Sequence, residues 1–383
     1  MKLRVERDVL AESMVLVARS LPSRPSVPIL AGLLVEAEDG QLVLSGFDYE
    51  TSVRVTVPAQ VADTGRCIIP GRLAAEISSS LPGLPVDLSM DGAKAQITCG
   101  SSHFALQTLP ADEYPALPDF PATSGTVRSD VLAQAVAQVA IAAGREDTLP
   151  VLTGVQVEIE GSTITLLATD RYRLAVRVLE WSPRSPNVSA AVLVPARVLA
   201  EIAKAMTGTD IVVSLPGSGD GIVGFEGGAP GGRRRTTTRL LDGEFPKVRR
   251  IIPAEASIVT RARIDTAGLI EAVKRVALVA ERNTPVRLTF CESTLTLDAG
   301  TGDEAQASES VEARVAGEPV TVGFNPTYLL DGLSVIRAPV AQLAFTQAAK
   351  AAELTGLKDF DGDPISEFRY VVVPVRLNNW SRR

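Results

Sequence analysis

Few side chains in this sequence belong to the types that catalyse reactions or bind metals. The 383 residues include one histidine, His103, and three cysteines. His103 lies in an alternating pattern typical of a strand, where we interpret a lone histidine as structural. Because Cys67, Cys99 and Cys291 are far apart and odd in number, we expect a reducing compartment, without a disulfide framework or zinc site. No metal and no cofactor is predicted.

The densest polar cluster is the run Asp170-Arg171-Tyr172-Arg173. An enzyme would use Asp170 as a general base and Arg173 as its electrostatic partner. However, an aspartate, Asp48, stands at the same place in an internal repeat, and no arginine directly follows it. We therefore interpret the repeated aspartate as a turn or capping residue at a strand end. The sequence predicts no catalytic residue, and an enzyme remains a distant alternative.

Two further motifs have a possible chemical meaning. The glycine-rich run 227–232 lacks the Lys-Ser/Thr pair of a phosphate-binding loop and opens no helix, so it is not interpreted as a nucleotide site. Arg233-Arg234-Arg235 is the one basic run. It fits either a solvated loop flank or a phosphate contact, and we favour the solvated flank.

Composition favours an ordinary soluble globular protein, with 45% apolar and 22% charged residues. The formal net charge is −7, but a total does not exclude a basic face on an acidic molecule. The N-terminus has no apolar run, and no window is long and apolar enough to span a membrane. We therefore expect a cytoplasmic protein without a membrane partner.

The helices and strands that position these residues belong to an internal sequence repeat. Residues 8–48 align with residues 130–170 at a constant shift, and about a third of the aligned positions are identical. A weaker third copy begins near Asp265. A repeat of this length is a whole domain and not a short solenoid unit. We predict three domains, with copy one at 1–125, copy two at 126–255 and copy three at 256–383.

Each copy follows one plan of helix, strand hairpin, further strand, second helix behind a proline or an Asn-Pro pair, and closing strands. Asp39-Gly40 and Gly161-Ser162 predict the tight turns of the hairpins. The class is therefore α+β, with two helices on one face of mainly antiparallel sheet in each copy.

The opening helices carry predicted boundaries of their own. We expect Asp8 to cap the first helix, Ser129 or Asp130 to cap the corresponding helix of copy two, and Gly144 to end it. The opening helix of copy three is predicted at 266–281.

Five motifs, in order and in the right copies, carry a family resemblance. They are Arg-Pro-Ser-Val-Pro-Ile-Leu at 24–30, Gly-Phe-Asp-Tyr-Glu at 46–50, Ala-Thr-Asp-Arg-Tyr-Arg-Leu-Ala-Val at 168–176, Leu-Asp-Gly-Glu-Phe-Pro-Lys-Val-Arg-Arg at 241–250, and Val-Pro-Val-Arg-Leu at 373–377. Over essentially residues 1–377 the chain resembles the bacterial sliding clamp family, the β subunit of the replicative DNA polymerase III holoenzyme.

The resemblance implies a non-catalytic processivity factor. It implies a head-to-tail homodimer, whose six similar domains form a ring around duplex DNA, with helices inside and sheets outside. Such a ring slides without sequence specificity and tethers replicative and repair DNA polymerases and the clamp loader. The alternative from another class is a repeat-built interaction scaffold that never encircles DNA, and its mass in solution would distinguish it.

The resemblance also implies residue roles. A basic channel would contact DNA through Arg24, Arg72 and Arg197, with Lys204, Lys274 and Arg275 as weaker candidates. The dimer joint would pair the strand bearing Phe104 and Leu106 with the helix bearing Leu278 and Val279. A groove between copies two and three would bind a hydrophobic partner peptide through Leu152, Thr169, Arg171, Tyr172, Arg173, Leu174, Pro246, Arg250, Ile251, Val371, Val372, Val373, Pro374, Val375 and Arg376.

Three places depart from the family pattern. Arg171 and Tyr172 replace a small residue and a histidine in the groove. Glu146 lies in a loop where the family member that we compared places glutamine and tyrosines toward DNA. The tail 378–383 runs past the usual end of the chain, and we expect it over or beside the groove.

Overall fold

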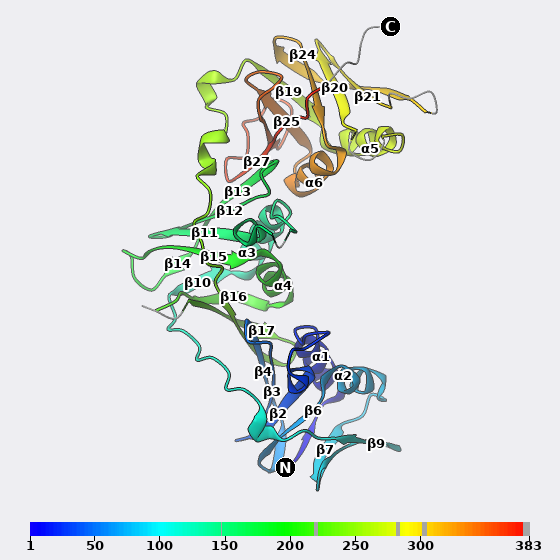
Figure 1. Cartoon of the computed structure of the whole chain (residues 1–383), viewed down its shortest axis with the longest axis vertical. Coiled ribbons are helices and arrows are strands. Elements are labelled where there is room, and N and C mark those ends of the chain that lie inside the picture. The colour runs from blue at the N-terminus through cyan, green and yellow to red at the C-terminus, as the bar shows by residue number, and fades with distance from the viewer. Residues whose placement is uncertain (147, 218–220, 281–283, 301–304, 378–383) are drawn as a thin grey trace.

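Three similar copies follow one another along an elongated, curved molecule (Figure 1). The computed structural model describes residues 1–146, 148–217, 221–280, 284–300 and 305–377. In each copy two helices pack on one side of antiparallel strands, so the predicted α+β class is confirmed. The predicted position of the tail 378–383 lies outside the described residues.

Copy one contains two helices and nine strands within the described residues. They are β1 (Lys2–Val5), α1 (Arg7–Ala18), β2 (Gly32–Glu38), β3 (Gln41–Phe47), β4 (Thr51–Pro58), β5 (Gln60–Asp63), β6 (Gly65–Pro70), α2 (Gly71–Ser80), β7 (Val86–Asp91), β8 (Lys94–Cys99) and β9 (Ser102–Gln107). The predicted Asp39-Gly40 turn is confirmed, because both residues have positive φ (39° and 75°), as a tight hairpin turn requires.

Copy two repeats this plan. Its elements are β10 (Gly125–Arg128), α3 (Ser129–Ala140), β11 (Gly154–Glu160), β12 (Thr163–Thr169), β13 (Arg173–Glu180), β14 (Ser182–Pro183), β15 (Ser189–Pro195), α4 (Ala196–Ala205), β16 (Thr207–Ser214), β17 (Ile222–Ala229) and β18 (Gly232–Arg239). Gly161-Ser162 joins β11 to β12, as predicted. The run Arg233–Arg235 lies within β18 and not in a loop, so its interpretation as a loop flank was wrong.

Copy three completes the chain. Its elements are β19 (Thr260–Asp265), α5 (Thr266–Ala277), β20 (Val286–Cys291), β21 (Thr294–Ala299), β22 (Ala307–Glu312), β23 (Arg314–Gly317), β24 (Val320–Phe324), α6 (Pro326–Ile336), β25 (Val340–Phe345), β26 (Ala352–Leu357) and β27 (Phe368–Val372). Helix α5 begins as predicted but ends at Ala277, short of the predicted 281, which itself lies outside the described residues.

Some predicted caps were wrong. Helix α1 begins at Arg7 and α3 at Ser129, so Asp8, Ser129 and Asp130 lie inside the first helical turns. Gly144 follows α3 by several residues and donates its N–H to the carbonyl of Leu152 (2.7 Å). An acidic residue near a helix start stabilises the helix dipole from the first turn as well as from the cap, so sequence alone does not separate the two positions.

Two sheets cross the boundaries between copies. A nine-stranded sheet pairs β18 of copy two with β4 of copy one, and a second pairs β13 of copy two with β27 of copy three. The two terminal sheets are smaller, with five strands ending at β9 and four strands ending at β22. The copies are therefore joined by backbone hydrogen bonds, and within the described residues β9 and β22 are unpaired edge strands at the two ends of the molecule.

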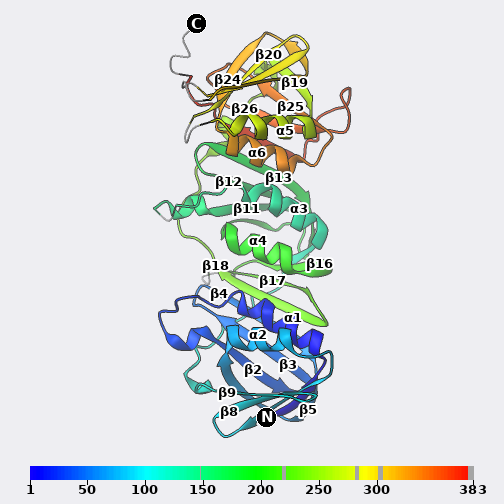
Figure 2. The same ribbon diagram turned by 90° about the vertical axis from the view of Figure 1, so that its right-hand side faces the viewer.

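The helices lie on the concave side of the molecule, the two nine-stranded sheets lie behind them, and the two smaller sheets lie at the ends (Figures 1 and 2). The inward stripes of the helices and the facing strands form one apolar core in copy one and a second that is continuous through copies two and three. The described helices carry about as many carboxylates as Lys and Arg side chains. They do not by themselves supply the basic surface that we expected on this side.

Candidate functional site

The junction of copies two and three brings together segments that are far apart in sequence. Strand β13 pairs with β27 so that Arg173 lies opposite Val372. Beyond β27, the N–H of Val373 donates to the carbonyl of Tyr172 (2.8 Å), and the N–H of Val375 donates to the carbonyl of Gly323 (2.8 Å). The end of the described chain is thereby held between a loop of copy two and strand β24 of copy three.

The turn before β13 is built by Asp170. Its Oδ1 accepts hydrogen bonds from the backbone N–H groups of Tyr172 (3.0 Å) and Arg173 (3.1 Å). Asp48 makes the same two contacts in copy one, so the interpretation of the repeated aspartate as a turn residue is confirmed. The turn places Arg171 at φ 80°, a left-handed conformation that non-glycine residues seldom adopt.

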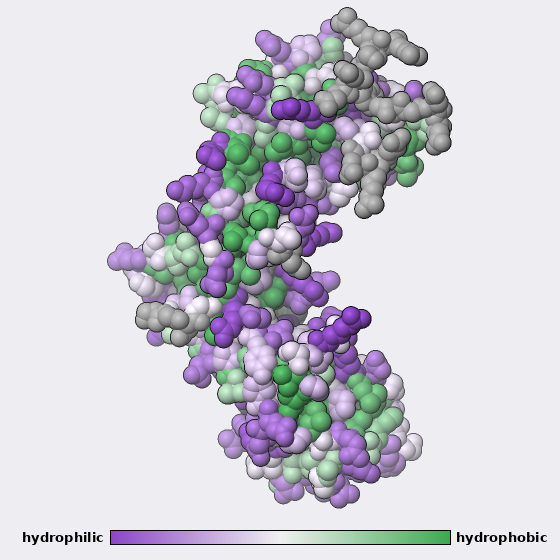
Figure 3. Space-filling view, in the orientation of Figure 1, coloured by the Kyte–Doolittle hydropathy of each residue, from purple (hydrophilic) through white to green (hydrophobic). Residues whose placement is uncertain are grey.

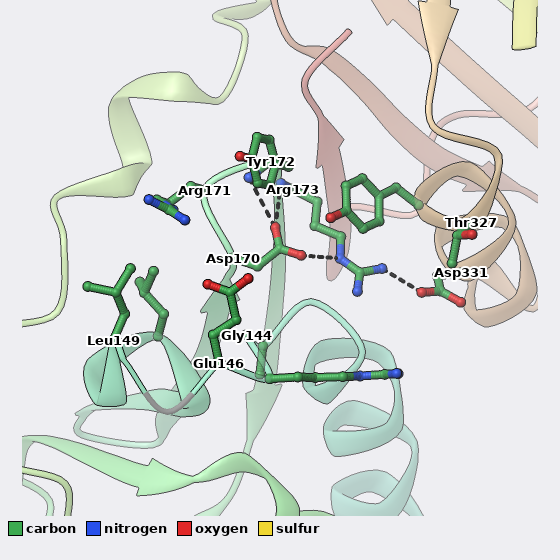
Figure 4. A pocket seen from close by; sticks show the side chains of 13 residues that line it. Gly144, Glu146, Leu149, Asp170, Arg171, Tyr172, Arg173, Thr327 and Asp331 are labelled. Atoms are coloured by element: carbon green, nitrogen blue, oxygen red, sulfur yellow. Dashed lines mark hydrogen bonds and ion pairs between the residues drawn. The ribbon is translucent and has the colours of Figure 1, made fainter. Parts of the chain in front are cut away.

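The guanidinium of Arg173 crosses the junction (Figure 4). Its Nε donates to Asp170 Oδ2 (2.9 Å) in copy two, and its Nη1 donates to Asp331 Oδ2 (2.5 Å) on α6 of copy three. The side chain is 5% exposed and also lies over the ring of Tyr328 at 4.5 Å. Burial alone would lower the pKa of Arg173, but Tyr370 and the two carboxylates raise it above the usual value. Arg173 is therefore a fixed cation at this junction.

Two hollows lie at this junction, and a third lies near it within copy two. The first, of 220 Å³, is lined by Glu146, Arg171 and Tyr172 of copy two and by Asp331 of copy three (Figure 4). The second, of 690 Å³, lies between Tyr172, α6 and the segment Val373–Val375. The third, of 720 Å³, lies under the loop 241–250. The stacked rings of Tyr172 and Tyr328, with centroids 6.1 Å apart, stand between the first two hollows.

Most residues predicted for a peptide groove line these hollows. The lining residues among them are Leu152, Arg171, Tyr172, Arg173, Pro246, Arg250, Val373, Pro374 and Val375. Leu174 and Val371 are buried in a small apolar cluster beside them, against which Ile251 packs. Thr169 is buried and donates its hydroxyl to the carbonyl of Arg173 (2.6 Å). Arg376 is exposed beside Val375.

The structure places Val372 elsewhere. Successive residues of a strand face opposite sides, and Val372 points into the main core while Val371 faces the small cluster.

Sequence reasoning also missed Tyr328, Asp331 and Phe245, which line the hollows. The only signal for Tyr328 was its place after the Asn-Pro start of α6, where Asn325 accepts its N–H. Helical spacing by itself does not distinguish a junction residue from a core residue.

The arginines predicted to contact DNA are exposed. Arg24 lies in the loop before β2. Arg72 donates to the carbonyl of Leu21 (3.0 Å), which fixes its side chain near the start of α2. The side chain of Arg197 is 92% exposed and contacts Glu201 on the same helix (3.4 Å). No catalytic geometry accompanies these arginines.

The residues predicted for the dimer joint lie at opposite ends of the chain. Leu278, at the end of α5, is 84% exposed, and its neighbour Val279 is half-buried. Phe104 lies half-buried on the edge strand β9, whereas Leu106 is buried in the core of copy one. Leu278 has the largest exposed fraction among the exposed large apolar residues within the described part of the chain.

Catalytic and metal-binding features are not found in the described part of the chain. No group of three or more His, Cys, Asp or Glu residues there is placed to hold a metal ion. His103 lies on β9 and contacts Thr98 through Nδ1 (3.3 Å). Among the described helices, none is long and apolar enough to cross a membrane.

Comparison with known proteins covers nearly the whole chain. Models of the N-terminal, central and C-terminal domains of the DNA polymerase III beta subunit match residues 1–118, 126–247 and 249–376. The chain is 55% identical to the Beta sliding clamp of Streptomyces coelicolor, over 99% of this chain and 100% of that protein. It is 51% identical to the Beta sliding clamp of Micrococcus luteus, over 81% and 98%.

A solved structure shares the architecture. The DNA polymerase sliding clamp from Bacillus subtilis superimposes with a TM-score of 0.89 at 26% identity, covering 99% of this chain and 100% of that chain. The chain therefore belongs to the DNA polymerase III beta subunit family, the β sliding clamps, which are non-catalytic processivity factors of DNA polymerase III.

Proposed function

We propose that the chain performs this role as a head-to-tail ring of two protomers, which encloses duplex DNA and tethers polymerases through the groove between copies two and three. One observation carries the ring proposal. Both junctions within the chain lie inside nine-stranded sheets, whereas the terminal sheets have five and four strands. Pairing β9 of one protomer with β22 of its partner would make a further nine-stranded sheet at each joint, and no edge would remain there.

The apolar residues at the two ends support this joint. Phe104 lies on β9, and Leu278 and Val279 lie after α5, which packs against β22. Burying such side chains against one another stabilises association by the removal of apolar surface from water. The buried side chain of Leu106 packs β9 against the core of copy one.

In a closed ring the concave, helical side faces the DNA. Exposed arginines such as Arg24, Arg72 and Arg197 contact phosphates, which carry no sequence information and therefore permit sliding. A ring stays on closed circular DNA by topology, so these contacts need not be strong. The mixed charge of the helices is consistent with weak contacts.

The hollows at the junction of copies two and three fit a short hydrophobic peptide with a few polar contacts. The apolar walls come from Leu152, Pro246 and Val373–Val375, and Arg171 and Arg250 supply charge at the edges. We propose that replicative and repair DNA polymerases and the clamp loader present this peptide.

The ring is tested by mass in solution. Replacing Leu278 by lysine places a charge at the proposed joint without affecting the fold, because the side chain is 84% exposed in the single chain. We expect wild-type protein to sediment as a dimer and Leu278→Lys as a folded monomer with an unchanged far-ultraviolet circular dichroism spectrum. Val259→Lys, at an exposed valine outside the joint, should remain a dimer. A wild-type monomer at micromolar concentration would instead favour the repeat-built scaffold.

A further inference from the structure

A cleft on the concave side, between copies one and two, has no ligand assigned to it above, although one of its lining residues, Lys204, was a weaker candidate for DNA contact. It has a volume of 560 Å³ and lies between α1, α4 and the start of β18. The surface of the molecule is indented on this side between the two copies (Figure 3). Its lining includes Arg234, the middle residue of the one basic run of the sequence, which we interpreted from the sequence as a solvated loop flank.

Alternation along β18 separates the three arginines of this run. Arg233 and Arg235 lie on one face, where both contact Glu226. Arg234 lies on the other face and lines the cleft, with only 5% of its surface exposed. Its Nε donates to Thr236 Oγ1 (3.0 Å), and within the described residues its terminal nitrogens have no hydrogen-bond or ion-pair partner. Burial lowers the pKa of Arg234 to about 10, while the carboxylate of Glu201 in the same cleft acts in the opposite direction, and Arg234 stays charged at neutral pH.

The second junction shows that such a cleft is not a general property of the fold. Arg234 pairs with Val55 where β18 meets β4, and Phe368 pairs with Arg177 where β27 meets β13. Because the turns of Asp48 and Asp170 align β4 with β13, Phe368 occupies the position of Arg234 in the other junction. Phe368 is buried in the apolar core.

The helices are also in closer contact at the second junction than at the first. At the junction of copies two and three, Gln138 on α3 donates its side-chain N–H to the carbonyl of Val335 on α6 (2.9 Å). The corresponding residues at the first junction are Leu16 on α1 and Ala205 on α4, and both line the open cleft. At the first junction the helices leave an open space, and an arginine is buried beneath it. At the second junction the helices are in contact, and a phenylalanine takes the place of the arginine.

The mouth of the cleft carries charges of both signs. Arg19 and Lys204 are exposed there, and no side-chain partner is found for either within the described residues. Glu12 and Glu201 are exposed there as well, and Glu201 contacts Arg197 (3.4 Å). The cations exceed the carboxylates by one, and the deepest charge is a cation.

We propose that this cleft is a phosphate-binding site, with Arg234 as its anchoring cation and Arg19 and Lys204 at its mouth. Within the described residues, no carboxylate lies at ion-pair distance from Arg234, and a bound anion would offset the cost of burying this side chain. The planar fork of a guanidinium presents parallel donors that match two phosphate oxygens. The phosphate has two potential sources: the backbone of DNA on the concave side, or a free anion such as pyrophosphate. Binding of the DNA backbone in this cleft rests on the proposed ring, whereas binding of a free anion does not.

The test compares two ligands with matched variants. Pyrophosphate binding is measured by calorimetry at constant ionic strength, and binding of a short linear duplex by fluorescence anisotropy at low salt. Arg234→Met removes the charge at similar volume, and Arg233→Met removes the neighbouring charge on the opposite face. For the true ligand we expect Arg234→Met to weaken binding by about tenfold or more, as for a lost charge-assisted hydrogen bond, and Arg233→Met to change it little.

A double variant, Arg19→Gln with Lys204→Gln, keeps the test independent of the buried substitution, because both side chains are exposed. The double variant should weaken binding of the same ligand whose binding Arg234→Met weakens. Loss of pyrophosphate binding assigns a free-anion site, and loss confined to the duplex assigns a backbone phosphate. Wild-type affinity of folded Arg234→Met for both ligands, or no saturable pyrophosphate binding together with unchanged duplex binding, would overturn the site. A monomeric wild type would contradict the ring but leave the pyrophosphate result valid.

Discussion

At the scale of single residues, arginines in similar strands have different environments. Arg173 is buried between two carboxylates that belong to different copies, and it links those copies. Arg234 is equally buried but lacks a carboxylate in contact. Arg128 is exposed beside Asp130 and contributes little to stability. Burial and pairing therefore decide what each arginine does, and the residue type alone does not.

Arg173→Met should destabilise the protein, because Asp170 and Asp331 lose the cation between them. We expect the free energy of unfolding to fall by about 3 kcal/mol, near the lower end for a broken buried pair, since Asp331 is partly exposed. Urea unfolding measures this change. Arg128→Met removes an exposed ion pair and should cost less than about 1 kcal/mol. Equal effects of the two substitutions would show that Arg173 is not a structural link.

The cysteines provide a test that depends on pH. Burial raises the pKa of the Cys67 thiol from 9.0 to about 11, whereas Cys291 is exposed. Iodoacetamide at pH 8 should therefore alkylate Cys291 in the folded protein and Cys67 only after unfolding, as mass spectrometry can show. Since the unfolded thiol loses its proton first, Cys67 contributes stability below about pH 9 that is lost as pH rises toward 11. Rapid labelling of Cys67 in folded protein would contradict this burial.

At the scale of elements, the groove depends on a segment that pairs with two copies. Val375 is 40% exposed beside the junction, so Val375→Asp should leave the fold intact while placing a charge in an apolar hollow. We expect a labelled hydrophobic peptide from the replicative polymerase to bind at least about tenfold more weakly, as measured by fluorescence anisotropy. Val178→Asp, at a similarly exposed valine toward the other end of β13, is the control. Unchanged affinity of Val375→Asp would remove this segment from the groove.

Local elements were predictable because their signals are local. The Asp39-Gly40 turn and the alternating strands around it were readable in the sequence, and the repeat transferred them to copy two. The pairing of β4 with β18 was not readable, because residues from different copies meet there without a local pattern. For the same reason Arg234 was assigned to a loop, and Asp331 was missed as the partner of Arg173. The groove residues themselves came from family resemblance and remain a prediction.

At the scale of the whole molecule, continuity of the sheets suggests how the proposed ring of two chains would close. Two junctions within the chain are sealed by backbone hydrogen bonds, and the ends present the edges β9 and β22. A ring of two such chains would have the helices around its opening, because they lie on the concave side (Figure 2). Retention on DNA would then depend on topology more than on the strength of any contact.

The most direct measurement is retention of the clamp on nicked circular DNA, after loading by its clamp loader, before and after the circle is cut once. The account predicts that the loaded protein stays on the circle at salt concentrations that abolish its binding to a short linear duplex, because counterion effects weaken contacts but do not open a ring. Cutting the circle should release it by sliding off the ends. Equal loss from circular and linear DNA as salt rises, or full retention after cutting, would contradict encirclement.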